Sequence, residues 1–97
     1  MAKRILFSNV RVPECPRVRF MRKTGRADRE KVEDVTGRVI KLIIEDSEDG
    51  SDFFSLLRLD VDGNVIWRTR HPSMQETKWQ AEFEYGLPEE RWEPCVE

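Results

Sequence analysis

The stretch FFSLLRLDVDGNVIWRTR, residues 53–70, constrains the fold more than any other part of the chain. Two apolar runs flank the pair Asp62-Gly63, and Asp-Gly between such runs is the strongest short-range signal for a β-hairpin. The stretch therefore predicts two neighbouring antiparallel strands, and the rest of a sheet has to be built around them.

The register of this hairpin has two alternatives. A two-residue turn pairs Arg58 with Trp67, whereas a three-residue turn with Gly63 in the left-handed region pairs Leu57 with Trp67. Because side chains alternate along a strand, the choice decides which face of the sheet carries Trp67 beside its partners. The sequence leaves both alternatives open.

A helix is predicted directly after the hairpin, over residues 73–85. Ser73 is a good N-cap, and Glu76, three residues on, completes a capping box. Pro72 keeps the preceding chain extended, and Gly86 suits the left-handed position that follows a helix.

Further strands are indicated by apolar composition and alternation, at residues 3–12, 17–23, 38–45 and around 91–96. Alternation turns Val18 and Phe20 inward, and it gives the third of these strands one apolar face made of Ile40, Leu42 and Ile44. The polar segment 24–37 predicts a loop, with a short helix starting at Asp28 as the alternative.

Strands followed by one late helix predict an α+β fold. We expect an antiparallel sheet of four or five strands, with a single C-terminal helix (about 73–85) packed on one face. Ninety-seven residues suit one domain, residues 1–97.

Composition limits where the chain works and what it binds. No apolar run approaches the roughly 18 residues that span a bilayer, and the basic start does not continue as a signal peptide, so we expect a cytoplasmic protein. In a reducing cytoplasm Cys15 and Cys95 are expected to be free thiols. The chain has one histidine and no C-x-x-C, which argues against a metal site.

Charge is distributed unevenly along the chain. Residues 3–31 hold ten Lys or Arg and three acidic residues, whereas residues 49–97 hold five and eleven. The two halves could form a polarised surface or pair with each other. Nucleic-acid binding is one alternative function, through a basic N-terminal sheet face made of Arg11, Arg17, Arg19, Arg22, Lys23 and Arg26. The pI of about 5.5 argues against this alternative.

His71 is the candidate for catalysis, because it is the only histidine and it precedes a helix. A small enzyme that uses His71 is therefore the second alternative, although the sequence shows no nucleophile motif, phosphate loop or carboxylate pair beside it. We expect no catalytic residue, no cofactor and no metal.

The predicted helix has two apolar sides. At about 100° per residue, one side holds Met74, Thr77, Ala81 and Tyr85, and roughly opposite stand Trp79 and Phe83. A polar line of Glu76, Gln80 and Glu84 separates them. Three alternatives remain for the second side: cover by Trp92 and Leu87 from the tail, exposure as a contact for a protein or a second copy, or reversed faces with Trp79 and Phe83 inward.

The stretch DGNVIWRTRHPSMQETKWQAEFEYG, Asp62–Gly86, resembles a motif of small bacterial proteins of unknown function. In these proteins a D-G hairpin leads to T-x-H and then to a helix ending Q-A-x-F-E-(Y or F)-G. The resemblance implies a cytosolic α+β domain and brings no activity, cofactor or catalytic residue. Trp79 departs from the polar residue expected at its position, which predicts that Trp79 is exposed.

Together these observations predict a small non-enzymatic module that binds a protein partner or forms a homodimer, with an immunity- or antitoxin-like role by analogy of size and charge. The predicted protein-contact residues are Trp79, Phe83 and Trp92.

Overall fold

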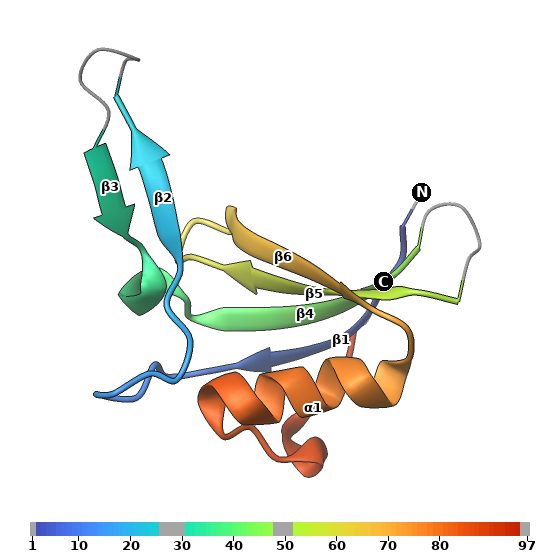
Figure 1. Cartoon of the computed structure of the whole chain (residues 1–97). Helices are drawn as coiled ribbons and strands as arrows, with labels where there is room; N and C mark the ends of the chain where they lie inside the picture. Colours follow the sequence, from blue (N-terminus) through green and yellow to red (C-terminus); the bar gives the residue numbers. More distant parts are fainter. Residues whose placement is uncertain (1, 26–30, 48–51, 96–97) are drawn as a thin grey trace.

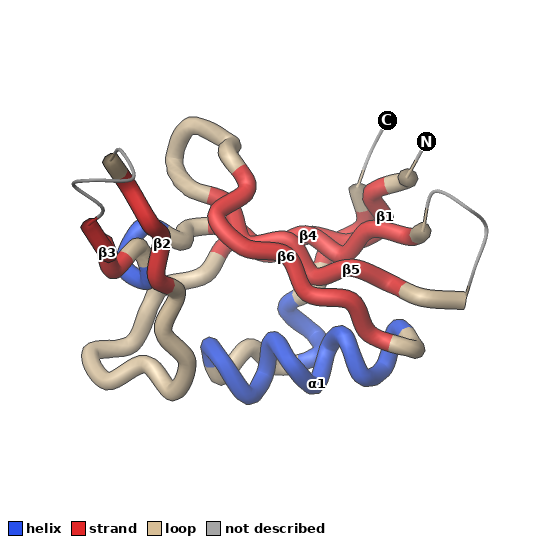
Figure 2. The backbone as a smooth tube through the Cα atoms, turned by 45° about the horizontal axis from the view of Figure 1, so that its top comes forward, coloured by secondary structure: helices blue, strands red, loops and turns tan. Residues whose placement is uncertain are grey.

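The computed structural model describes residues 2–25, 31–47 and 52–95, and it has the predicted α+β fold (Figure 1). Five strands form an antiparallel sheet in the order β6-β5-β4-β1-β7. Their bounds are β1 (Arg4–Asn9), β4 (Lys41–Asp46), β5 (Phe54–Leu59), β6 (Val65–His71) and β7 (Glu93–Pro94). The helix α1 (Met74–Tyr85) lies across one face of this sheet, as Figure 2 shows from another side.

The main core lies between the sheet and the helix. Leu42 and Ile44 of β4, Leu56 of β5 and Ala81 of α1 are fully buried there. Side chains along β4 and β5 alternate between the two faces of the sheet. On the face away from the helix, Ile43, Leu57 and Leu59 form a second buried cluster against Phe7.

Helix α1 begins and ends as its local signals predict. The Ser73 side chain accepts a hydrogen bond from the backbone N–H of Glu76 at 3.1 Å. Gly86 adopts φ 67°, and its N–H donates to the Glu82 carbonyl. Thr77 and Ala81 face the sheet, which excludes the alternative with Trp79 and Phe83 inward.

The β5–β6 hairpin combines features of both predicted registers. Gly63, at φ 83°, closes a three-residue turn in which Asp60 pairs with Asn64. A bulge then inserts Ile66, so that Arg58 pairs with Trp67. The turn is thus the three-residue form, while the pairing beyond the bulge is that of the two-residue form.

Residues 31–34 are a strand, which corrects the predicted loop. β2 (Met21–Thr24) and β3 (Lys31–Asp34) form a separate two-stranded sheet that projects from the body (Figures 1 and 2). We call this hairpin the arm. The short 3-10 helix η1 (Thr36–Arg38) follows it, and the alternative helix from Asp28 lies largely outside the described residues. These strands are mostly polar and show no alternation of apolar and polar residues. The sequence pattern therefore does not distinguish this segment from a loop.

The arm joins the body at Phe20 and Val35, which are both buried. The Val35 N–H donates to the Phe20 carbonyl at 2.9 Å, and the Phe20 N–H donates to Thr36 Oγ1 at 2.7 Å. Val18 and Phe20 do face the core, as predicted, although regular strand begins only at Met21.

The inward face predicted for residues 38–45 holds only from Leu42 onward. Because η1 turns the chain before β4 begins at Lys41, Ile40 is exposed and does not share the buried face of Leu42 and Ile44, while Val39 is buried. The predicted strand near residues 91–96 shortens to β7, which follows the 3-10 helix η2 (Glu89–Arg91). In the described part of the chain, no helix is long and apolar enough to cross a membrane.

Candidate protein-contact surface

Trp79 and Phe83 stand on the solvent side of α1, one helical turn apart. Trp79 is 57% exposed and Phe83 is 49% exposed, so the tail does not cover them. Large aromatic side chains left exposed as neighbours are typical of contact surfaces. Of the three alternatives for this side of the helix, the structure has the exposed pair.

The segment that follows β1 provides an opposing wall beside the last turns of α1, where Figures 1 and 2 both place it. Pro13, Cys15 and Arg17 line an open hollow of about 740 Å³ together with Trp79 and Phe83. The Arg17 guanidinium lies over the Phe83 ring, 5.6 Å from its centre, in cation–π geometry. We call these five residues and their hollow the aromatic groove.

Trp92, the third predicted contact residue, lies elsewhere. It is only 9% exposed and belongs to the main core with Leu87. Its indole Nε1 is buried and has no hydrogen-bond partner among the described residues. The tail residues thus fill the core beneath the helix and leave the aromatic groove open.

A buried ion pair, which the sequence did not reveal, fixes the rotation of α1. Arg58 of β5 is fully buried, and its Nε donates to Glu84 Oε1 at 2.9 Å while Nη2 donates to Oε2. Gln80 Nε2 also donates to Glu84, at 2.6 Å. Glu84 is therefore not part of an exposed polar line. Its neighbour Phe83 is held outward as long as the pair is intact.

Arg58 has partners on several sides. Its Nη1 donates to the Leu56 carbonyl at 3.0 Å and to Thr69 Oγ1 at 2.9 Å, and the Phe20 ring lies 5.0 Å from its guanidinium carbon. The Trp67 ring packs on Phe20 at 5.5 Å, which the bulge makes possible by placing Trp67 opposite Arg58. Arg58 and Glu84 are far apart in the sequence, and no local pattern indicates that two such residues form an ion pair. Their pairing could therefore not be predicted.

His71 belongs to the same network. Its Nε2 shares a 2.8 Å hydrogen bond with Thr69 Oγ1, which also accepts from Arg58. Burial, reinforced by the Arg58 charge and opposed by Glu84 and Glu76, lowers the pKa of His71. Burial likewise raises the pKa of Tyr85, whose hydroxyl has no hydrogen-bond partner among the described residues. In this setting His71 is a neutral side chain at the corner between β6 and α1.

The predicted nucleic-acid residues do not share one sheet face. Arg11, Arg17 and Arg19 lie on the segment between β1 and β2, whereas Arg22 and Lys23 lie on the arm. Arg26 lies outside the described residues.

Arginines in and next to the arm form ion pairs with Glu33 and Asp34 of β3. Arg19 contacts Asp34 at 2.9 Å, and both Arg22 and Arg38 contact Glu33. Hydrogen bonds from Thr36, aided by Arg19, lower the pKa of Asp34 and keep it charged. Arg19, Arg22 and Arg38 are therefore each offset by a carboxylate of β3.

Cys15 and Cys95 are both free, as expected for reduced thiols. Cys15 is exposed beside the aromatic groove, and Cys95 is half-buried where its N–H donates to the Ile5 carbonyl. Among the described residues, no cluster of three His, Cys, Asp or Glu side chains could hold a metal ion.

No protein-family model matches the chain, and no curated protein or solved structure matches it either. The resemblance over Asp62–Gly86 therefore stays a prediction.

Proposed function

We propose that this chain is a small, non-enzymatic, cytoplasmic protein-binding module that takes an apolar segment of a partner protein into the aromatic groove. The observation that carries the proposal is the outward display of Trp79 and Phe83 over a walled hollow. Trp and Arg are the residue types that dominate binding energy at protein interfaces, and Trp79 and Arg17 flank the same hollow.

The groove is well supported from beneath, which favours binding. The Arg58–Glu84 pair and the capped ends of α1 hold the helix in one orientation. A preorganised surface loses little conformational entropy on binding. Most of the free energy gained by burying its exposed aromatic side chains can therefore contribute to affinity. An immunity- or antitoxin-like role, in which a compact domain masks its partner, is one form of this proposal and rests on analogy of size.

The test is selection of displayed random peptides on the wild-type protein, followed by affinity measurement with Trp79→Ala and Phe83→Ala. Each variant should weaken binding about tenfold or more, because hot-spot aromatic residues contribute at least that much. Phe53→Ala is the matched control, since Phe53 is 46% exposed but lies outside the groove, beside Arg70. Circular dichroism should show all variants folded.

Two results would overturn the proposal. One is peptide binding that is indifferent to both groove substitutions. The other is sedimentation equilibrium showing that the wild type dimerises and Trp79→Ala does not, since a second copy would then occupy the groove.

Nucleic-acid binding is the second candidate, and the projecting arm is the observation that favours it. Arg22, Lys23 and Lys31 are exposed there, and a two-stranded ribbon suits a major groove. Binding of duplex DNA or RNA that weakens steeply with salt and fails in Arg22→Glu would support this candidate. Salt-independent binding would argue against it.

A further inference from the structure

Most arginines that the structure describes contact a carboxylate, and three of the four exceptions gather at one place. Within residues 2–25, 31–47 and 52–95, ion pairs hold Arg4, Arg19, Arg22, Arg38, Arg58 and Arg68. Arg11, Arg17, Arg70 and Arg91 have no carboxylate partner in the same residues. Arg70 stacks on Phe53, and the other three lie around the C-terminal end of α1.

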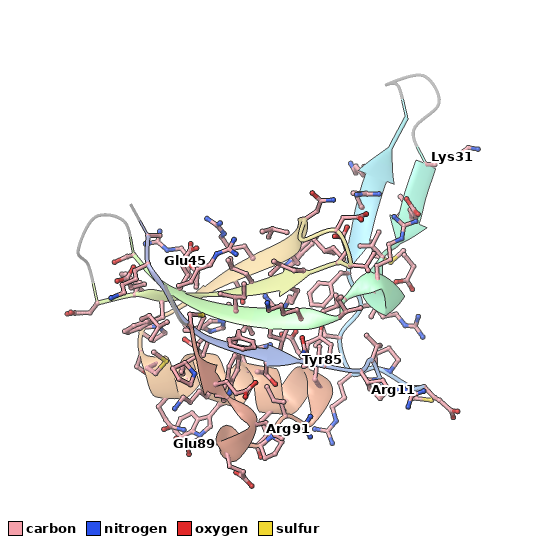
Figure 3. The ribbon with its side chains drawn as sticks, turned by 180° about the vertical axis from the view of Figure 1, so that it is seen from behind. Arg11, Lys31, Glu45, Tyr85, Glu89 and Arg91 are labelled. Carbon is pink, nitrogen blue, oxygen red and sulfur yellow. The ribbon has the colours of Figure 1, made fainter. Side chains whose placement is uncertain are left out.

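Arg11 and Arg91 flank a second hollow, of about 390 Å³, next to the aromatic groove. Asn9, Leu87 and Pro88 line it with them, and Tyr85 and Gly86 border both hollows. Figure 3 shows Arg11, Tyr85 and Arg91 at the same end of the molecule. We call this second hollow the arginine pocket.

Glu82 is exposed and lines the aromatic groove, but among the described residues no carboxylate forms an ion pair with Arg11, Arg17 or Arg91. Glu89, in the same short helix as Arg91, contacts Lys78 at 3.2 Å instead. Glu84 is used by Arg58. The carbonyls at the end of α1 favour a cation nearby. That attraction explains why positive charge is tolerated at this place, but it leaves the guanidinium N–H groups of Arg11 and Arg91 open to a ligand.

We infer that the partner segment is both apolar and acidic: its apolar side chains enter the aromatic groove, and an Asp or Glu carboxylate binds Arg11 and Arg91 in the arginine pocket. Guanidinium groups hold carboxylates through paired, charge-assisted hydrogen bonds, which give specificity as well as affinity. Arg17 lines the aromatic groove, where it stacks on Phe83, and adds a further positive charge for an acidic partner segment. The inference rests on the proposed function and specifies its partner.

The experiment uses three arrays of synthetic peptides of about ten residues, a length that covers a typical groove-bound segment. The arrays share the same apolar positions, and their remaining positions are Asp or Glu, Asn or Gln, or Lys or Arg. The acidic array should bind best. The affinity of its best peptide should fall about tenfold or more when its acidic residues become amides, and also in Arg11→Gln and Arg91→Gln. Arg70→Gln is the matched control, because Arg70 also lacks a carboxylate partner but lies away from both hollows.

The outcomes separate the inference from the proposed function. Equal binding of acidic and neutral peptides that is still lost in Trp79→Ala would overturn the inference and leave the proposed function standing. A preference for the basic array, or an equal effect of Arg70→Gln, would also overturn the inference. If no array binds in a manner that depends on Trp79 and Phe83, both the inference and the proposed function are wrong. Unchanged thermal unfolding in the Arg11 and Arg91 variants would show that the loss of binding is not a loss of structure.

Discussion

The contact between Arg58 and Glu84 shows how single residues decide what this surface presents. A buried charge is costly to desolvate, and its partner offsets that cost only when the geometry is satisfied on both sides. Arg58 meets this condition through Glu84, Thr69 and the Leu56 carbonyl. If α1 rotated, Glu84 would lose the Arg58 donors Nε and Nη2, so the pair selects the orientation that turns Phe83 outward.

Removing one member of this pair should destabilise the protein strongly. Glu84→Ala leaves the Arg58 charge buried and unpaired, and it should lower the free energy of unfolding by about 3–5 kcal/mol. The combined change Arg58→Met with Glu84→Leu should cost less than the sum of the single changes, because no charge remains buried. Urea unfolding measures all of them.

The ion pairs that Glu33 forms with Arg22 and Arg38 at the surface provide the comparison for this measurement. Glu33→Ala should cost no more than about 1 kcal/mol, since solvent screens the arm. A cost for Glu84→Ala as small as that of Glu33→Ala would contradict the role given to the buried pair.

His71 should titrate below its ordinary pKa of 6.5, because burial and then Arg58 disfavour its charged form. Between its folded pKa and about 6.5, the unfolded chain binds more protons than the folded one, so stability falls as pH drops through this window. NMR titration measures the pKa of His71 directly, since the chain has one histidine. His71→Gln should remove this part of the pH dependence, and a pKa at or above 6.5 would contradict the buried environment.

At the scale of elements, the features that depend on neighbouring residues, such as the ends of the helix, could be predicted from the sequence. The N-cap at Ser73 and the left-handed Gly86 fixed the helix limits within one residue, because capping involves only neighbouring backbone groups. Strand β3 was missed because its partner β2 supplies its pairing, and its own residues are polar. The bulge at Ile66 was also missed, since it depends on how Trp67 packs against Phe20 across the structure.

The β5–β6 turn gives a test at this scale. Gly63→Ala should destabilise the protein by about 1–2 kcal/mol, because a side chain at φ 83° meets the backbone unfavourably. Gly37→Ala is the control: its added Cβ also meets nothing within 4 Å, but its φ is not in the left-handed region. It should change stability by no more than about 0.5 kcal/mol. Thermal unfolding of both variants is sufficient, and equal effects would contradict a special role for the turn.

At the scale of the whole molecule, the candidate surface could be predicted only in part. The exposed pair Trp79 and Phe83 follows from helical periodicity and was among the predicted contact residues. The opposing wall of Pro13, Cys15 and Arg17 comes from a segment far away in sequence, which only the sheet order brings beside α1. Arg11 reaches the arginine pocket for the same reason, whereas Arg91 follows α1 closely, in η2. A surface assembled from separate segments has no signature in any one of them.

The arm is the part of the molecule least supported by the core. Its two strands pair only with each other, and Met21 and Val32 are exposed. Backbone amides of β2 and β3 should therefore exchange with solvent at least about tenfold faster than those of β4 and β5, as measured by hydrogen exchange with NMR. Equal protection of the two sheets would show that the arm unfolds together with the body.

The position of β1 affects how the chain folds during synthesis. Strands β4, β5 and β6 and helix α1 follow one another along the chain, and each contacts the element next to it in sequence. β1 emerges first, yet its neighbours in the sheet are β4 and β7, where Leu6 pairs with Ile44 and Pro94. The apolar run Ile5–Phe7 therefore has no strand partner until β4 has been synthesised, and the other edge of β1 has none until β7 has been synthesised.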